Sequence, residues 1–503
     1  MLFKTGSLVR LAAVLCVVVV SGAFVPMTHA ADPALRVGVA QVEITPPVGF
    51  PMAGYYHERL AQGTANPLWA KAIVFQDGPV QGAWVVCDLT GVSIDLATTV
   101  RRRAAERTGI PFENIVVSAT HSHTAPDYYR ALYRHLGPAE EIKTDTDRER
   151  AAYTGRLVDA IAQSIADAQK GAIAAKLRSG SATQETPVSF SRRFVMRDGS
   201  QQTWVGLKHP EAVRCANPID PEIGLLQIRR AEDDAPTGLV SNFALHLDTV
   251  GGHMWHADYP YAIEQAVRKE LGEKAVSLFG TGCCGDINHA DPTGAARRTA
   301  EAIGSALGTT ICGGLAGLKE VEKPRLTVAS RRVDLPLEPV TPAEVLQSLE
   351  LVKAAQAGQT VPFLEHVLAY KRLMLDQLLR KEPTVDGTGL VSLGLSRTWR
   401  GVGESLPIDV TVFGVGDDVA IVFLPGEVFV ELGLAIKQAS PYRTTMVVEL
   451  SQCVETIYIP TRAGSVGGGY EVTNSLVKRG SGEMLVEAAV GLLRESRAGA
   501  LKP

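Results

Sequence analysis

Two histidines separated by one residue, His121 and His123, are the first side chains in this sequence whose spacing could support catalysis. They follow a β-branched run at residues 115–117, which predicts a buried strand, and they precede Pro126, where regular structure should have ended. If the backbone is still extended there, side chains at positions i and i+2 point in the same direction. Two imidazoles would then leave the end of a strand together, as a metal site or an acid–base pair requires.

A second concentration of histidines follows another predicted strand, residues 240–245. His246 comes directly after this strand, and His253 and His256 lie in the loop that follows, so three of the 11 histidines are close together. Asp248 and Asp258 are in the same loop. Such a concentration is typical of metal sites. Taken singly, however, a histidine in a loop is more often a hydrogen-bonding surface residue than a ligand.

Other ionisable residues also stand where predicted strands end. Asp88 and Glu427 each follow an apolar run. A carboxylate in this position can orient a ligand histidine or cap a turn, and the sequence does not decide between these roles for Asp88. Arg192 and Arg193 lie between aromatic residues. They are interpreted as a surface pair, and the alternative is a clamp for an anion or a substrate oxygen.

The composition and the glycine-rich segments exclude some classes of ligand. The chain has 503 residues, 46% of them hydrophobic and 21% charged, as in ordinary soluble globular proteins. Its formal net charge is −4 and it has no long basic run, so we expect no nucleic-acid partner. The turn at residues 280–286 matches neither the phosphate-binding loop nor the Rossmann spacing, so nucleotide binding has no support.

The first 30 residues have the features of a secretory signal peptide. Lys4 and Arg10 precede an apolar run at residues 11–20, and Thr28-His29-Ala30 places small residues at the expected cleavage positions. We therefore expect a secreted or periplasmic protein; an uncleaved membrane anchor is the alternative. Six of the seven cysteines lie beyond residue 30, which permits disulfides without assigning them.

Beyond the leader, short strands, glycine- or proline-rich loops and amphipathic helices alternate, which predicts an α/β fold. Residues 145–170 predict a long helix. No internal repeat or obvious linker divides the chain, so a single catalytic domain over residues 31–503 is expected. A capping box at Thr341–Glu344 opens a predicted helical pair, and residues 341–385 could form an insertion or a lid.

Taken in order, these segments resemble the neutral/alkaline non-lysosomal ceramidase family of secreted zinc amidases. The resemblance is carried by residues 43–45, 68–72, 119–123, 242–246, 285–286 and 425–427 and by the tyrosines Tyr458 and Tyr470, twelve residues apart. It implies a single large mixed-sheet domain that hydrolyses an amide bond. Because the chain ends soon after Tyr470, we expect this domain without the C-terminal β-sandwich of the larger members.

The resemblance also implies roles for individual residues. The family's zinc ligands fall on His121, His246, Glu427 and Tyr458, and its catalytic residues fall on His123, Arg192 and Tyr470. Two imidazoles, a carboxylate and a phenol suit Zn²⁺, which lowers the pKa of a bound water to about 7. The implied substrate is a small molecule, a lipid or a glycan-derived compound. Peripheral contact with a membrane and the oligomeric state remain open.

One departure from the family affects the predicted substrate. Alignment on Gly285 and Asp286 puts Gly282 where the family has a serine important to activity. Ceramide is therefore not the sole candidate, and another N-acyl compound is possible. Two further readings stay open: a zinc-dependent polysaccharide lyase that uses the same tyrosine, arginine and histidine, and a homologue that binds a metal or ligand without turnover.

Overall fold

The computed structural model describes residues 2, 6 and 35–500, and Ala34–Pro503 form one compact unit. Apart from Leu2 and Gly6, the predicted signal peptide lies outside the described residues. Among the residues described, no helix combines the length and the apolar character needed to cross a membrane.

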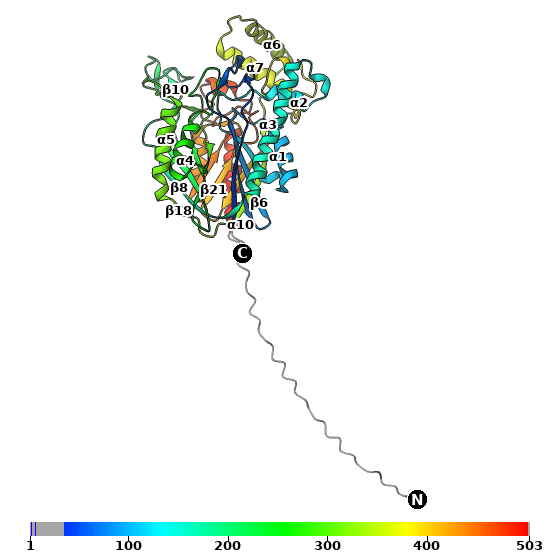
Figure 1. The fold of residues 1–503 in the computed structure, drawn as a ribbon. Helices are drawn as coiled ribbons and strands as arrows, with labels where there is room; N and C mark the ends of the chain where they lie inside the picture. The colour runs from blue at the N-terminus through cyan, green and yellow to red at the C-terminus, as the bar shows by residue number, and fades with distance from the viewer. Residues whose placement is uncertain (1, 3–5, 7–34, 501–503) are drawn as a thin grey trace. The chain divides into compact units, whose positions relative to one another are not determined.

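A mixed sheet of nine strands is the centre of this unit (Figure 1). Its strands are β1 (Arg36–Glu43), β5 (Trp69–Asp77), β6 (Val80–Cys87), β7 (Ile115–Ala119), β8 (Ile173–Thr183), β13 (Glu222–Arg230), β14 (Pro236–Phe243), β16 (Val276–Thr281) and β18 (Lys319–Glu320). Their order in space is β16-β14-β13-β8-β1-β5-β6-β7, and β18 pairs with β8. The pairs β6–β7 and β14–β16 are parallel. The other pairs in this sheet are antiparallel.

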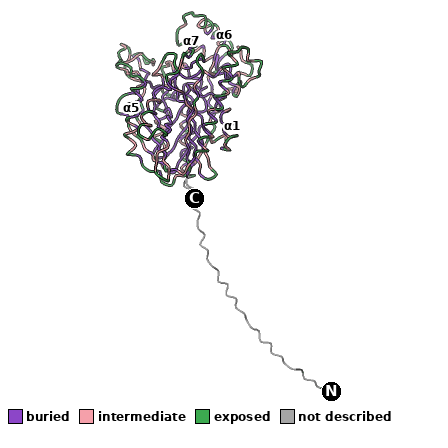
Figure 2. Tube along the Cα trace, in the orientation of Figure 1, coloured by how far each residue is buried: buried purple, intermediate pink, exposed green. Residues whose placement is uncertain are grey.

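Alternating apolar side chains explain why this sheet is covered on both faces. Along β5, Ala72 and Val74 face one hydrophobic core, while Ile73 and Phe75 face another. The first face packs against long helices, namely α1 (Ile94–Thr108), α3 (Asp145–Lys170), α4 (Tyr259–Leu271) and α5 (Ala300–Gly314). The helix predicted at residues 145–170 is confirmed with the same bounds. Buried residues therefore lie at the centre of the fold, and exposed residues lie on its outer helices and loops (Figure 2).

The second face packs against a smaller sheet. Its strands, in spatial order, are β19 (Leu326–Pro336), β20 (Ser405–Val415), β21 (Val419–Phe423) and β23 (Thr444–Val448). Large side chains fill the interface: the rings of Trp84 and Phe423 are 5.4 Å apart, and those of Phe75 and Phe413 are 6.5 Å apart. Helices α8 (Val430–Ala439) and α10 (Ser481–Ala500) pack on the other face of this sheet. The predicted α/β class with one large mixed sheet is confirmed.

Two further helices, α6 (Pro342–Gln356) and α7 (Phe363–Leu379), lie between β19 and β20 in the chain, at the end of the unit opposite the C-terminus (Figure 1). Thr341 and Glu344 form the predicted capping box. The remaining short elements are β2 (Pro51–Met52), β3 (Arg59–Leu60), β4 (Gly63–Thr64), β9 (Phe190–Ser191), β10 (Arg193–Met196), β11 (Gln201–Thr203), β12 (Ala212–Cys215), β15 (Met254–Trp255), β17 (Ile287–Asn288), β22 (Glu427–Val428), β24 (Tyr458–Ile459), α2 (Tyr129–His135) and α9 (Tyr470–Asn474).

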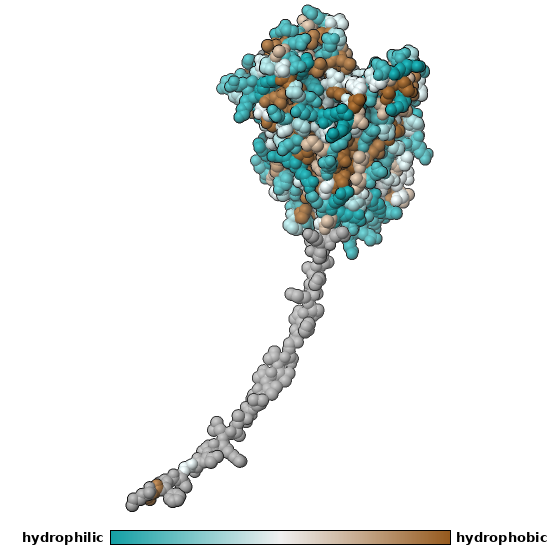
Figure 3. Space-filling view, turned by 180° about the vertical axis from the view of Figure 1, so that it is seen from behind, coloured by the Kyte–Doolittle hydropathy of each residue, from teal (hydrophilic) through white to brown (hydrophobic). Residues whose placement is uncertain are grey.

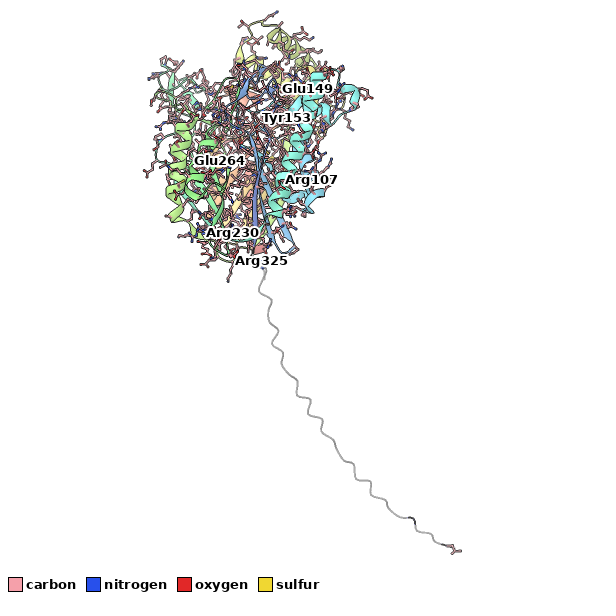
Figure 4. All side chains as sticks on the ribbon, viewed as in Figure 1. Arg107, Glu149, Tyr153, Arg230, Glu264 and Arg325 are labelled. Carbon is pink, nitrogen blue, oxygen red and sulfur yellow. The ribbon has the colours of Figure 1, made fainter. Side chains whose placement is uncertain are left out.

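Buried polar contacts tie the helices to the large sheet. Glu264 of α4 accepts a hydrogen bond of 2.7 Å from the ammonium group of Lys71 in β5, and Tyr153 of α3 donates one of 2.7 Å to the carbonyl of Ile44. Glu264 and Tyr153 are labelled in Figure 4. Removing one partner of a buried ion pair leaves an unpaired charge and typically costs about 3–5 kcal/mol. Lys71, one of the residues that carry the family resemblance, therefore has a structural role.

Candidate metal centre and active site

Three histidine rings meet beyond the carboxyl ends of β7 and β14. The Nε2 atom of His121 is 3.1 Å from Nε2 of His246 and 3.3 Å from Nε2 of His123. Each ring offers a nitrogen within 4.8 Å of the nitrogens of the other two, an arrangement that could hold a metal ion. The sequence placed His121 and His246 at two strand ends, and the fold brings these ends together.

The two strand ends meet because a third segment bridges them. β7 and β14 are far apart in the order of the sheet. The segment after β23, however, forms backbone hydrogen bonds with β7 and with β16, the neighbour of β14. The amide of Ala119 donates to the carbonyl of Leu450 at 3.1 Å, and the amide of Glu449 donates to the carbonyl of Thr281 at 3.0 Å. The hydroxyl of Thr281 also donates to the carbonyl of Thr120 at 2.7 Å. The histidines are thus fixed by three different parts of the chain.

The backbone at His121 differs from the prediction. β7 ends at Ala119, and His121 has φ of 82°, so the expectation of an extended backbone at the His-x-His pair is wrong. A positive φ is uncommon for a residue other than glycine and often marks a functional site. The turn still brings the two rings together, at 4.9 Å between centroids. Nδ1 of His121 is 2.5 Å from the carbonyl of Thr90, and donation to that carbonyl leaves Nε2 free to bind a metal.

Glu427 adds a carboxylate to the cluster. Its Oε2 atom lies 3.4 Å from Nε2 of His121 and 4.0 Å from Nδ1 of His246, is buried, and has no hydrogen-bond partner among the described residues. Burial raises the pKa of this carboxyl group, but His121 and Arg192 outweigh it, so the pKa is lowered overall. An ionised, unpaired, buried oxygen beside imidazole nitrogens is the donor set that a divalent cation would satisfy. The residues present therefore fit a metal ion.

Tyr458 reaches the cluster through strand pairing. β22 and β24 are parallel, and Glu427 lies directly opposite Tyr458 in the register. The phenol interacts electrostatically with the carboxylate of Glu427. Burial, reinforced by Glu427, holds the pKa of Tyr458 well above its usual value, so without a cation the phenol stays protonated. Tyr470 follows three glycines with positive φ, and its ring is 5.5 Å from that of Tyr458.

The arginine pair is buried, so its interpretation as a surface pair is wrong. Arg192 donates through Nε to Glu471 at 2.8 Å and through Nη2 to the carbonyl of Gly285 at 2.7 Å. Its Nη1 lies 3.4 Å from both ring nitrogens of His246. Arg193 donates to the carbonyls of Gly464 and Gly468 and so anchors the loop that leads to Tyr470. A hydrophobic pattern in the sequence could not reveal that Arg192 is buried, because its partner carboxylate, that of Glu471, is almost 280 positions away.

His123 has the most exposed side chain of the three histidines. It lines a cavity of about 570 Å³, as do His121, Glu427, Tyr458 and Tyr470, whereas His246 and Arg192 lie behind the cavity wall. Burial lowers the pKa of His123 to about 4, against the opposing effect of Asp248. Nδ1 of His123 is 3.7 Å from Oδ1 of Asp248 and has no hydrogen-bond partner among the described residues.

Sequence reasoning missed most of the cavity wall. Tyr55 and Tyr56 come from the loop after β2, Gln356 from the end of α6, and His366 and Tyr370 from α7. The Gly-Tyr-Tyr-His segment at residues 54–57 was the available signal. Gly54 has φ of 98°, and a Cβ there would lie 2.8 Å from Cβ of His123, so this loop packs closely against the histidine.

Several candidate residues lie outside the cluster. Asp88 accepts hydrogen bonds from the amide of Trp69 and the hydroxyl of Thr120, so it holds loops together and touches no histidine ring. Asp258 caps the start of α4, and the ring of His253 lies at the carbonyl of Leu60. The six cysteines within the described residues are free thiols, namely Cys87, Cys215, Cys283, Cys284, Cys312 and Cys453.

Gly282, at the position of the family serine, has no room for a side chain. A Cβ atom there would lie 2.9 Å from the amide nitrogen of Ala244 and 3.0 Å from the carbonyl carbon of Phe243. We expect Gly282→Ser to lower the free energy of unfolding by about 1–3 kcal/mol, because the segment leading to His246 would have to shift. Denaturant unfolding checks this, with Gly313→Ser, which meets open space, as the control. Equal unfolding free energies in the two variants would contradict it.

Asp286 predicts a pH dependence of stability. Burial raises the pKa of this carboxyl group from 3.8 to about 7, and its Oδ1 accepts from the amide of Val430. Between pH 4 and 7 the folded protein therefore binds more protons here than the unfolded chain, so stability falls as pH rises through this range. Relative to Asp286→Asn, wild type should lose up to roughly 4 kcal/mol between pH 4 and 8. Denaturant unfolding across this range measures the difference; parallel pH curves would contradict the assignment.

Comparison with known proteins agrees with the resemblance read from the sequence. Residues 35–256 match the profile of a family described as neutral/alkaline non-lysosomal ceramidase, N-terminal. No curated protein matches the chain. The neutral ceramidase from Pseudomonas aeruginosa has a similar structure, with a TM-score of 0.65 and 20% identity over 92% of this chain and 75% of that one. A ceramidase described as complexed with C2 is similar over the same shares, with a TM-score of 0.66 and 19% identity.

At these identities the structural likeness establishes the fold. The matched residues 35–256 include His121, His123, Arg192 and His246. The family supports a hydrolase, and the histidine cluster could hold a metal. Residues 35–256 are therefore similar to the N-terminal part of the neutral/alkaline non-lysosomal ceramidase family.

Proposed function

We propose that this protein is an exported, zinc-dependent hydrolase that cleaves the amide bond of ceramide or of another N-acyl substrate. The observation that carries the proposal is the convergence of three imidazoles and one unpaired buried carboxylate oxygen, with two of the imidazoles, those of His121 and His123, and Glu427 lining a single cavity. The ceramidase family match supports the reaction class. Export rests on the signal-like features of residues 1–30, and N-terminal sequencing of the mature protein would test it.

Four residues from the predicted set would hold the metal: His121, His246, Glu427 and Tyr458. Two nitrogen donors, a carboxylate and a phenol oxygen suit a borderline Lewis acid such as Zn²⁺. When bound, zinc supplies Lewis-acid polarisation of the substrate carbonyl and activation of a water molecule. Because the phenol of Tyr458 is protonated without the ion, metal loading should release a proton from this residue or from a water.

The remaining residues act directly on the substrate. His123 borders the cavity and its lowered pKa keeps the ring neutral at pH 7, so it can accept a proton and then pass it to the leaving amine. Tyr470 borders the same cavity, and its protonated hydroxyl can donate to the oxygen that becomes negative. Arg192 is a buried cation behind His246, so we assign it an electrostatic role. Peripheral membrane contact would accompany a lipid substrate.

The test is product analysis with the metal content measured on the same sample. Purified mature protein is incubated with fluorescent N-acylsphingosine and with a panel of N-acyl amines, with His246→Ala as the inactive control. We expect one zinc ion per chain and equal amounts of free amine and carboxylate. An unsaturated sugar released from an acidic polysaccharide would instead assign a lyase. Stoichiometric metal without turnover of any substrate would assign a binding protein.

A further inference from the structure

Helix α7 presents one continuous face to the cavity. His366, Tyr370 and Met374 line it, and these positions recur every turn along the helix. Phe363 begins the helix on the same face, one turn before His366. The helical segment predicted as an insertion or lid therefore forms a wall of the site.

Phe363 lies where this wall reaches the surface. Its ring is stacked on that of Tyr470 at 5.6 Å and 24°, and it meets the ring of Tyr56 edge-on at 5.8 Å. Both tyrosines line the cavity, yet Phe363 is 47% exposed. Leu364 beside it is 48% exposed. Apolar residues are exposed at the end of the unit that carries α6 and α7 (Figure 3).

A second exposed aromatic residue completes the patch from another part of the chain. Trp204, which follows β11, is 48% exposed, and its ring lies 4.9 Å from Tyr470 and 6.2 Å from Phe363. Its backbone has φ of 65°, a conformation that a bulky side chain rarely adopts. The amide of Trp204 donates to the carbonyl of Arg192 at 2.8 Å, and Thr203 donates to Glu471. The contacts that hold the site thus also hold Trp204 in this unfavourable conformation.

Resting on the hydrolase function proposed above, we propose that Phe363 and Trp204 form a subsite for the alkyl chain of the N-acyl substrate. A cavity of about 570 Å³ is of the size that encloses drug-sized ligands, so a long chain would extend past its rim. The aromatic pair is continuous with the cavity through Tyr470 and Tyr56, and two half-exposed aromatic rings side by side favour an apolar partner. The pair determines preference for chain length.

Chain-length dependence of turnover tests the subsite. For wild type we expect kcat/KM to rise from N-acetyl- to N-dodecanoyl-sphingosine, because each buried methylene is worth on the order of fourfold in binding. Phe363→Ala should reduce this long-to-short ratio of kcat/KM at least tenfold. Phe363→Leu should restore most of the ratio. Leu346→Ala, which removes an exposed leucine of α6 that does not line the cavity, is the control and should leave the ratio unchanged.

A binding measurement keeps the subsite testable if no N-acyl compound is turned over. Trp204 is the most exposed of the five tryptophans, so dodecylamine and dodecanoate at the subsite should change the intrinsic fluorescence. Phe363→Ala should weaken this binding at least tenfold, and Trp204→Phe should abolish the signal while keeping the chain-length ratio. Unchanged ratios and unchanged binding in Phe363→Ala would overturn the proposal. The proposal would also be overturned if Phe363→Ala altered only the binding to phosphatidylcholine vesicles, which would assign the patch to a membrane surface. A change in self-association alone would overturn it as well and would assign the patch to contact with a second copy of the chain.

Discussion

Substitution of His246 by alanine should reduce the zinc content of the purified protein to well below one ion per chain and abolish hydrolysis. His246 is buried behind the cavity wall, and its Nε2 lies 3.1 Å from Nε2 of His121, so no neighbouring side chain can replace it without rearrangement. Loss of an outer-shell partner of a metal ligand typically costs 10–100-fold in affinity or activity, and loss of a ligand itself should cost more. Elemental analysis measures the zinc, and hydrolysis of the wild-type substrate measures the activity. His121→Ala should behave in the same way.

The matched control comes from the same loop. His253 is exposed and its ring lies near the carbonyl of Leu60, away from the cluster. His253→Ala should therefore bind zinc like wild type. Full zinc in His246→Ala, with wild-type content in the control, would remove the metal centre from its assigned place. Loss of zinc in both variants would indicate that any substitution in this loop disturbs zinc binding.

The candidate centre was partly predictable because strand ends have a local signature. A β-branched or apolar run followed at once by histidine or glutamate is visible in the sequence at His121, His246 and Glu427. The α/β class was predictable for a similar reason, since alternation such as that of Ile73 and Val74 records which side chains face which core. Neither pattern states which strand ends meet; that information came from the ordered family resemblance.

The rest depends on contacts that no local pattern records. Arg192 is buried because Glu471 neutralises it, and the two lie far apart in the sequence. The His-x-His pair converges through a turn with positive φ at His121, which backbone hydrogen bonds to distant loops maintain. The aromatic wall from α7 could not be predicted because its residues face the cavity only after the helical pair has packed on the domain.

His123→Ala should leave zinc bound but reduce turnover by roughly 10²–10⁴-fold, the usual contribution of a general acid–base residue. The three-histidine cluster also allows His123 to be a third nitrogen ligand, so this variant distinguishes two roles. The side chain of His123 is 13% exposed, against 3% for His121 and 2% for His246, and it is on the cavity side. Within the part of the chain that the structure describes, its Nδ1 has no hydrogen-bond partner, whereas Nδ1 of His121 lies at the carbonyl of Thr90.

These differences favour a proton carrier for His123, because ligand histidines are normally oriented by a hydrogen bond from their second ring nitrogen. Zinc content and kcat are therefore measured on the same preparation of His123→Ala, with His123→Gln as a second variant that keeps polarity without a titratable ring. We expect wild-type zinc, a substrate KM within a few-fold of wild type, and a large loss of kcat in both variants. Zinc loss equal to that of His246→Ala would make His123 a ligand. Wild-type kcat would leave proton transfer to another residue, for which Tyr470, on the same cavity wall, is the next candidate.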